Sequence, residues 1–268
     1  MTTDRATPGE GIELLYASLR GRGGQRAQLD SQLENADIAA AFAMTVADPG
    51  FARAGGPFFP PGSRTPLIDL VRRRSGTEED IVDTEHLQAL LWRPPRFAVA
   101  GRLELDFEFV AREIRPTSSL RAGKREWLTS DARRRISLDA LLVNAEDRTP
   151  IVAELKVGSD ENAELALVQA LAAAAQLSAL SQRRRLHVEY RDTFGSRPPD
   201  RVDVYVITSR APERGVRPAL AARAHTRATA LLESGMLDAW IRRIVFLEAS
   251  ITSGALTCSL VHNGAERP

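Results

Sequence analysis

The sequence predicts a mixed α/β fold of the α+β class, in which neighbouring strands form a sheet and helices pack on it. Residues 102–113 alternate between apolar and mostly charged side chains, which is the period of a strand with one buried face. Residues 136–143 and 151–157 are two apolar runs separated by a polar turn, the pattern of a β-hairpin. Helical patterns rich in alanine and leucine follow at residues 159–182 and 218–234.

The chain is expected to divide into three parts. Residues 1–75 would form a helical N-terminal extension, because residues 11–20 and 31–47 carry helical stripes of apolar side chains. Residues 76–262 would form the core, and residues 263–268 a frayed tail.

The core begins with a predicted helix that ends near Trp92, before two prolines. Residues 191–201 contain glycine and prolines and predict a loop. Residues 202–208 are almost continuously apolar, which predicts a central strand. Residues 243–249 predict a further strand, and residues 255–261 an edge strand.

Composition limits the class of protein. The formal net charge of +1 gives no overall case for nucleic-acid binding, so any such case rests on local patches. Cys258 is the only cysteine and is expected to be a small core residue. The N-terminus lacks the apolar run of a signal peptide, and no run reaches the ~18 apolar residues of a membrane helix. A cytoplasmic protein without a membrane partner is therefore expected.

Two carboxylates are expected to meet on the hairpin. If the hairpin folds symmetrically about its turn, Asp139 lies opposite Glu154, with about 5 Å between Cβ atoms. Like charges in this position repel, and in a dry site they raise the pKa of one partner. A divalent cation removes the conflict, and Mg²⁺ favours one or two carboxylates together with water and a phosphate. Lys156 lies on the same face, so the group suits phosphodiester hydrolysis.

The alternative interpretation of Glu154-Leu155-Lys156 is a solvated strand face, because the pattern Glu-x-Lys occurs often by chance. The apolar rear face of the hairpin and the opposed Asp139 favour the catalytic interpretation. No P-loop, Rossmann glycine motif, G-x-S-x-G elbow or zinc-ligand spacing competes with it in the sequence.

Residues 102–182 resemble the PD-(D/E)XK nuclease superfamily, on Asp139 followed by Glu154-Leu155-Lys156. The resemblance implies a restriction-endonuclease-like core of helix, three antiparallel strands, helix and strand. It implies that Asp139 and Glu154 bind Mg²⁺ or Mn²⁺, with the Leu155 carbonyl as an extra ligand. Lys156 would orient the attacking water or stabilise developing charge. The sequence departs from the motif just before Asp139, where leucine replaces proline.

The same resemblance suggests supporting residues on two helices. The helix before the first strand often donates a metal-ligating glutamate, for which Glu85 is the candidate and Glu113 the competitor. The helix after the hairpin often turns a glutamine to the site, and Gln169 is favoured over Gln176. Solvent exposure is the alternative for Glu85, and bonding to buried backbone groups is the alternative for the glutamines.

A basic connection precedes the hairpin, at residues 114–135. It could bind a phosphate backbone, or its charges could simply be solvated. Trp127 could stack on a base or fill the core. The nucleic-acid-binding residues predicted here are Arg121, Lys124, Arg125, Arg133 and Arg134.

The predicted function is a Mg²⁺- or Mn²⁺-dependent nuclease with Asp139, Glu154, Lys156 and Gln169 in its active site and DNA favoured over RNA as substrate. Many enzymes of this kind dimerise to cut both strands, so a homodimer is an open option. The alternative is a catalytically silent protein of the same fold that binds nucleic acid or protein.

Overall fold

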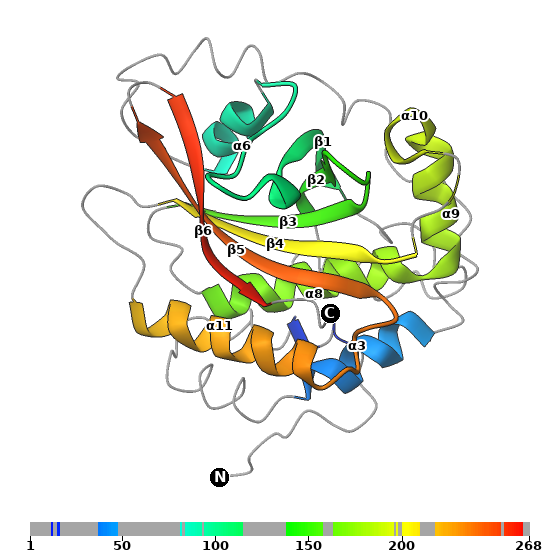
Figure 1. Ribbon diagram of the computed structural model, residues 1–268. Coiled ribbons are helices and arrows are strands. Elements are labelled where there is room, and N and C mark those ends of the chain that lie inside the picture. The colour runs from blue at the N-terminus through cyan, green and yellow to red at the C-terminus, as the bar shows by residue number, and fades with distance from the viewer. Residues whose placement is uncertain are drawn as a thin grey trace, which may run out of the picture.

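A six-stranded mixed sheet forms the centre of the computed structural model, in the order β1-β2-β3-β4-β5-β6 (Figure 1). Its strands are β1 (Phe107–Ile114), β2 (Leu138–Asn144), β3 (Pro150–Val157), β4 (Val202–Ser209), β5 (Ile241–Thr252) and β6 (Ala255–Gly264). The structure describes residues 12, 15–16, 37–47, 81, 84–92, 94–114, 138–157, 163–195, 197, 200–209, 218–252 and 255–264.

Strand direction changes across the sheet. β1, β2 and β3 are antiparallel neighbours, β3, β4 and β5 run parallel, and β6 returns antiparallel to β5. The central position of β4 and the edge position of β6 confirm the sequence prediction. The parallel strands β3, β4 and β5 therefore end at the same edge of the sheet.

Helices cover both faces of the sheet, which confirms a mixed α/β architecture (Figure 1). In the figure α6 lies above the sheet, and α3, α8 and α11 lie below it. The helices are α3 (Ile38–Ala47), α6 (Thr84–Trp92), α8 (Ala163–Ser178), α9 (Leu180–Glu189), α10 (Arg191–Phe194) and α11 (Pro218–Glu233). Within the described residues no single helix could cross a membrane, although α8 and most of α9, bent by 84°, pass that test together.

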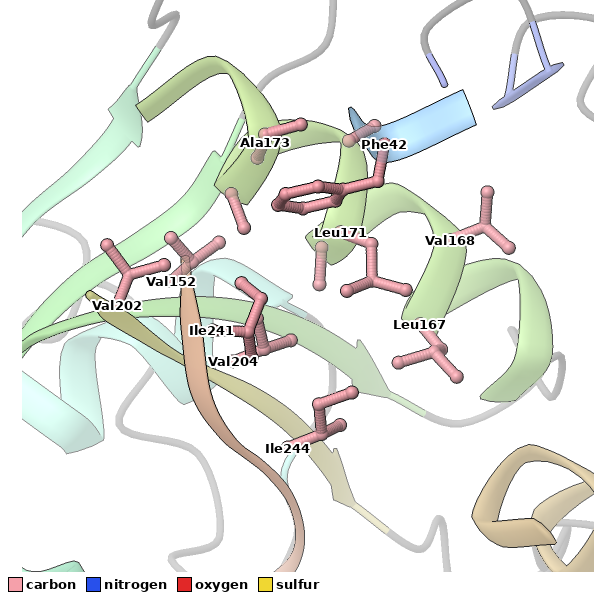
Figure 2. Packing of buried hydrophobic residues seen from close by; sticks show 14 of the residues in the cluster. Phe42, Val152, Leu167, Val168, Leu171, Ala173, Val202, Val204, Ile241 and Ile244 are labelled. Atoms are coloured by element: carbon pink, nitrogen blue, oxygen red, sulfur yellow. The ribbon is translucent and has the colours of Figure 1, made fainter. Parts of the chain in front are cut away.

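The larger core lies between the sheet and the helices below it. Figure 2 shows Leu167 and Leu171 of α8 over Val204 and Ile244 of the sheet. Burying a leucine or isoleucine side chain fully stabilises a fold by about 1.5–3 kcal/mol. Helix α3 packs against α8 through Phe42 (Figure 2).

The described part of the predicted N-terminal extension belongs to this larger core. Ile12, Leu15 and Tyr16 are buried in it together with α3. The Ile12 amide donates a hydrogen bond to the Thr45 hydroxyl of α3, with 2.9 Å between the atoms. These residues thus fold onto the sheet domain through α3 and α8.

The hairpin has the predicted register. Ala140 pairs with Ala153 and Leu141 with Val152, so the pairing is symmetric about the polar turn. Both faces of the hairpin are buried, one under α6 and the other under α8. The wholly apolar face is thus covered, and so is most of the face that carries the carboxylates.

The predicted strand at residues 102–113 begins too early. Leu103–Leu105 form a 3₁₀ turn, and Leu103 is 73% exposed instead of buried. The buried carboxylate of Asp106 accepts hydrogen bonds from the Arg96 side chain and the Val99 amide. These contacts hold the chain in a turn, so β1 starts only after them.

Three boundaries downstream also differ from the prediction. The helix expected at residues 159–182 breaks at Ala179, whose extended ψ of 134° ends α8 before α9 starts. The loop expected at residues 191–201 begins with the short helix α10. Asn263 and Gly264 of the expected tail pair with β5 as the end of β6.

A short segment connects the two edges of the sheet. Phe97 bridges Phe107 of β1, while Val99 bridges Cys258 of β6. The Ala100 amide adds a hydrogen bond of 3.0 Å to the Cys258 carbonyl. The segment of Phe97 and Val99 can reach both edges only because the sheet curves. The sheet curves around the core that it forms with α6. Cys258 is buried there, which confirms its predicted role as a core residue.

Asp203 anchors the end of the sheet opposite to the open end of the hairpin. Its fully buried carboxylate binds Arg242 at 2.6 Å and Arg243 at 3.1 Å.

We expect Asp203→Ala to lower the free energy of unfolding by about 3–5 kcal/mol, because two guanidinium groups lose their buried partner. Urea denaturation measures the loss, with Asp192→Ala as the control, because Asp192 is exposed in α10. A loss equal to that of the control would contradict the prediction.

Candidate active site

The open end of the hairpin places Asp139 between two strands. The recorded pairing of β2 with β3 ends at Ala140 and Ala153, one residue before Asp139 and Glu154. Beyond this point the Asp139 carboxylate Oδ2 accepts a hydrogen bond of 2.9 Å from the Leu155 amide. The Asp139 side chain thus takes the place of the next backbone contact between β2 and β3. This hydrogen bond fixes the Asp139 carboxylate beside Glu154.

Glu154 is a buried acid whose charge is only partly compensated. The side chain is 1% exposed, and its Oε1 lies 2.9 Å from the Lys156 ammonium. Its Oε2 is buried and accepts no hydrogen bond from the described residues. Burial, and then repulsion by Asp139, raise the pKa of Glu154 well above its usual 4.5, while Lys156 acts in the opposite direction. The predicted conflict between the two carboxylates is therefore present.

Gln88 of α6 supports Asp139 from the other face of the sheet. This glutamine is fully buried, and its Nε2 donates a hydrogen bond of 2.8 Å to the Asp139 carbonyl. Asp139 is therefore held at its carbonyl by Gln88 and at its carboxylate by Leu155. Gln88 was not predicted from the sequence as a residue of the site. A glutamine between the buried Leu87 and Leu91 was the available signal.

The structure does not bring the two other predicted acids into this group. Glu85 is exposed in the first turn of α6, one turn before Gln88. Glu113 lies in β1, and its side chain is outside the described residues. Among the residues that the structure describes, no three or more His, Cys, Asp or Glu side chains form a group that could hold a metal ion.

The predicted glutamine of α8 makes a different contact. Gln169 Oε1 accepts a hydrogen bond of 2.8 Å from the Tyr16 hydroxyl, which ties α8 to the N-terminal residues. Gln176 is buried farther along the helix. The basic residues predicted to bind nucleic acid lie outside the described residues, as does Trp127: Arg121, Lys124, Arg125, Arg133 and Arg134.

The donor set of the site fits a hard divalent cation. Asp139 and Glu154 offer oxygen ligands, and the buried Glu154 Oε2 accepts no hydrogen bond from the described residues. Oxygen-only sites suit Mg²⁺ or Mn²⁺, and Mg²⁺ commonly takes one or two carboxylates and fills its remaining positions with water and substrate phosphate. Two carboxylates are therefore sufficient for this type of site.

Comparison with known proteins adds no family to this description. No family model matches the chain, and neither a curated protein nor a solved structure does.

Proposed function

We propose that the protein is a divalent-metal-dependent nuclease, with DNA favoured over RNA. The observation that carries the proposal is the pair of the half-buried Asp139 and the buried Glu154 at the open end of the hairpin, with the Lys156 ammonium on Glu154. The chain order α6, β1, β2, β3, α8, β4, with β1 to β3 antiparallel, supports the restriction-endonuclease-like core that the resemblance implies.

Each residue of the site has a defined part in the mechanism. Asp139 and Glu154 would hold Mg²⁺ or Mn²⁺, with the Leu155 carbonyl as an additional donor. A bound divalent ion polarises the phosphate and lowers the pKa of water. Lys156 provides a fixed positive charge that orients the attacking water or stabilises the negative charge developing on the phosphate. Gln88 keeps the Asp139 backbone in place.

Cleavage assays test the proposed function. The purified protein is incubated with linear, circular and single-stranded DNA and with RNA, in Mg²⁺, in Mn²⁺ and in EDTA. We expect cleavage that requires the metal and is lost in Asp139→Asn. Cleavage that persists in EDTA or in a clean preparation of Asp139→Asn would refute the assignment.

A catalytically silent binding protein is the second candidate. It is favoured by the exposure of Glu85, which leaves two acids in the described part of the site. This candidate predicts salt-sensitive binding of nucleic acid or protein without metal-dependent turnover, so the same assays separate the two functions.

Gln88 offers a test of the support that surrounds the proposed metal ligands. We expect Gln88→Leu to raise the metal concentration for half-maximal cleavage by about 10- to 100-fold, the usual cost of losing a residue that positions a ligand. Gln182→Leu is the control, because Gln182 is equally buried but lies in α9. The control should change the melting temperature only. An unchanged metal requirement in Gln88→Leu would show that Gln88 is merely structural.

A further inference from the structure

A second charged cluster joins α8 to α11. Glu164 in the first turn of α8 is 1% exposed, and two arginines of α11 bind its two oxygens. Arg223 Nη2 lies 3.2 Å from Oε2, and Arg227 Nε lies 3.2 Å from Oε1. The arginine side chains remain 37% and 19% exposed, so solvent reaches both. The buried carboxylate thus holds two accessible cations in a fixed orientation.

The cluster lies at the same end of the sheet as the proposed active site. Helix α8 follows β3 and packs back on it, so its first turn lies near the end of β3 that carries Glu154 and Lys156. Glu154, Val206 and Phe246 lie side by side in β3, β4 and β5.

Helix α11 can be placed along that row of residues. His225, between the two arginines in sequence, contacts Phe246 with 4.6 Å between ring centroids. Neighbouring strands are about 4.8 Å apart, so Phe246 is about 10 Å across the sheet from Glu154. Arg223 and Arg227 lie one turn apart on the side of α11 that meets Glu164 of α8, away from the side that carries His225. The distance of about 10 Å to Phe246 is therefore an outer limit for their distance across the sheet from the proposed metal site.

Arginine at this position suits a phosphate backbone. The guanidinium group is planar and weakly hydrated and can bind a phosphate through two parallel hydrogen bonds. A carboxylate that already orders the side chain reduces the entropy lost on binding. Nucleotides rise by about 3.4 Å per residue along one strand of a duplex, so 10 Å corresponds to about three nucleotides.

We propose that Arg223 and Arg227 bind backbone phosphates of the nucleic acid a few nucleotides from the bond that is cut. Glu164 is the residue that positions both arginines. This inference rests on the proposed nuclease function and adds to it the direction of the substrate, from the open end of the hairpin past the first turn of α8 towards α11.

Equilibrium binding tests the inference without cleavage. Labelled duplex DNA is titrated in Ca²⁺ with Glu154→Gln protein, over a series of salt concentrations. Adding Arg223→Gln or Arg227→Gln should make the negative slope of log K against log salt shallower by about 0.9 each, the value for one lost phosphate contact. Arg191→Gln is the matched control, because Arg191 is exposed in α10. It should leave the slope unchanged.

The design separates failure of the inference from failure of the proposed function. Each arginine substitution is also made together with Glu164→Gln, so that no unpaired buried carboxylate remains, and folding is checked by the melting temperature. Folded arginine variants with the slope of Arg191→Gln would overturn the inference, even if the wild type cleaves DNA. Shallower salt slopes in a protein that never cleaves DNA would support phosphate binding by the arginines and refute the proposed nuclease function.

Discussion

Replacing Glu154 with glutamine should abolish metal-dependent cleavage. The substitution keeps the shape of the side chain but removes the charged oxygen that would bind the metal. Loss of a residue that only positions a ligand costs up to about 100-fold, so loss of a ligand should exceed 100-fold. Single-turnover cleavage rates measure the effect, with Glu146→Gln in the exposed turn of the hairpin as the control. A Glu154→Gln variant within tenfold of wild type would contradict the proposed role.

The same substitution should stabilise the metal-free protein. The pKa of Glu154 is raised above 4.5 in the folded state by burial and by Asp139, so the folded state binds this proton more tightly than the unfolded state. Its contribution to stability therefore falls as pH rises from about 4.5 through the folded-state pKa. Glutamine carries no charge, so this fall should disappear.

Urea unfolding at about pH 5 and about pH 8 measures this stability effect. In EDTA, Glu154→Gln should be more stable than the wild type at the higher pH, and Glu146→Gln should not. A variant that is less stable than wild type at both values would show that the Glu154 charge is already compensated within the protein.

Replacing Lys156 with methionine should slow cleavage by about 10²–10³, the usual effect of removing one group that stabilises charge in the transition state. The side chain keeps its length but loses the ammonium that lies 2.9 Å from Glu154. Metal binding should persist, because both carboxylates remain.

The Lys156 variant should also differ from Glu154→Gln in stability. Loss of the ammonium removes the contact that lowers the pKa of Glu154, so the metal-free protein should become less stable at neutral pH. Single-turnover rates and urea unfolding are measured together, with Arg184→Met as the control, because Arg184 is exposed in α9. Full cleavage by Lys156→Met would remove the lysine from the mechanism.

The hairpin was predictable because its local signals agree. Its apolar runs are equally spaced about a polar turn, so one register buries both runs. Asn144 stabilises that turn, since its side-chain oxygen accepts hydrogen bonds from the amides of Glu146 and Asp147. The register in turn brings Asp139 and Glu154 together, so the centre of the site follows from local sequence.

The support of the site depends on contacts between distant residues. The partners of Asp106, which shorten β1, are a side chain and an amide in the preceding segment. Glu85 and Gln88 share one helix, and only packing of α6 on the sheet decides that Gln88 meets Asp139. The two arginines that bind Glu164 come about 60 residues later in the chain. Periodicity carries no information about such pairs.

Metal titration followed by calorimetry shows whether Asp139 and Glu154 form a metal site. Mg²⁺ and Mn²⁺ are titrated into wild-type protein and Glu154→Gln, and melting temperatures are recorded in the same solutions. We expect binding and a rise in melting temperature for the wild type, with both lost in Glu154→Gln. Equal binding by the two proteins, or no binding by either, would contradict a metal site built on Asp139 and Glu154.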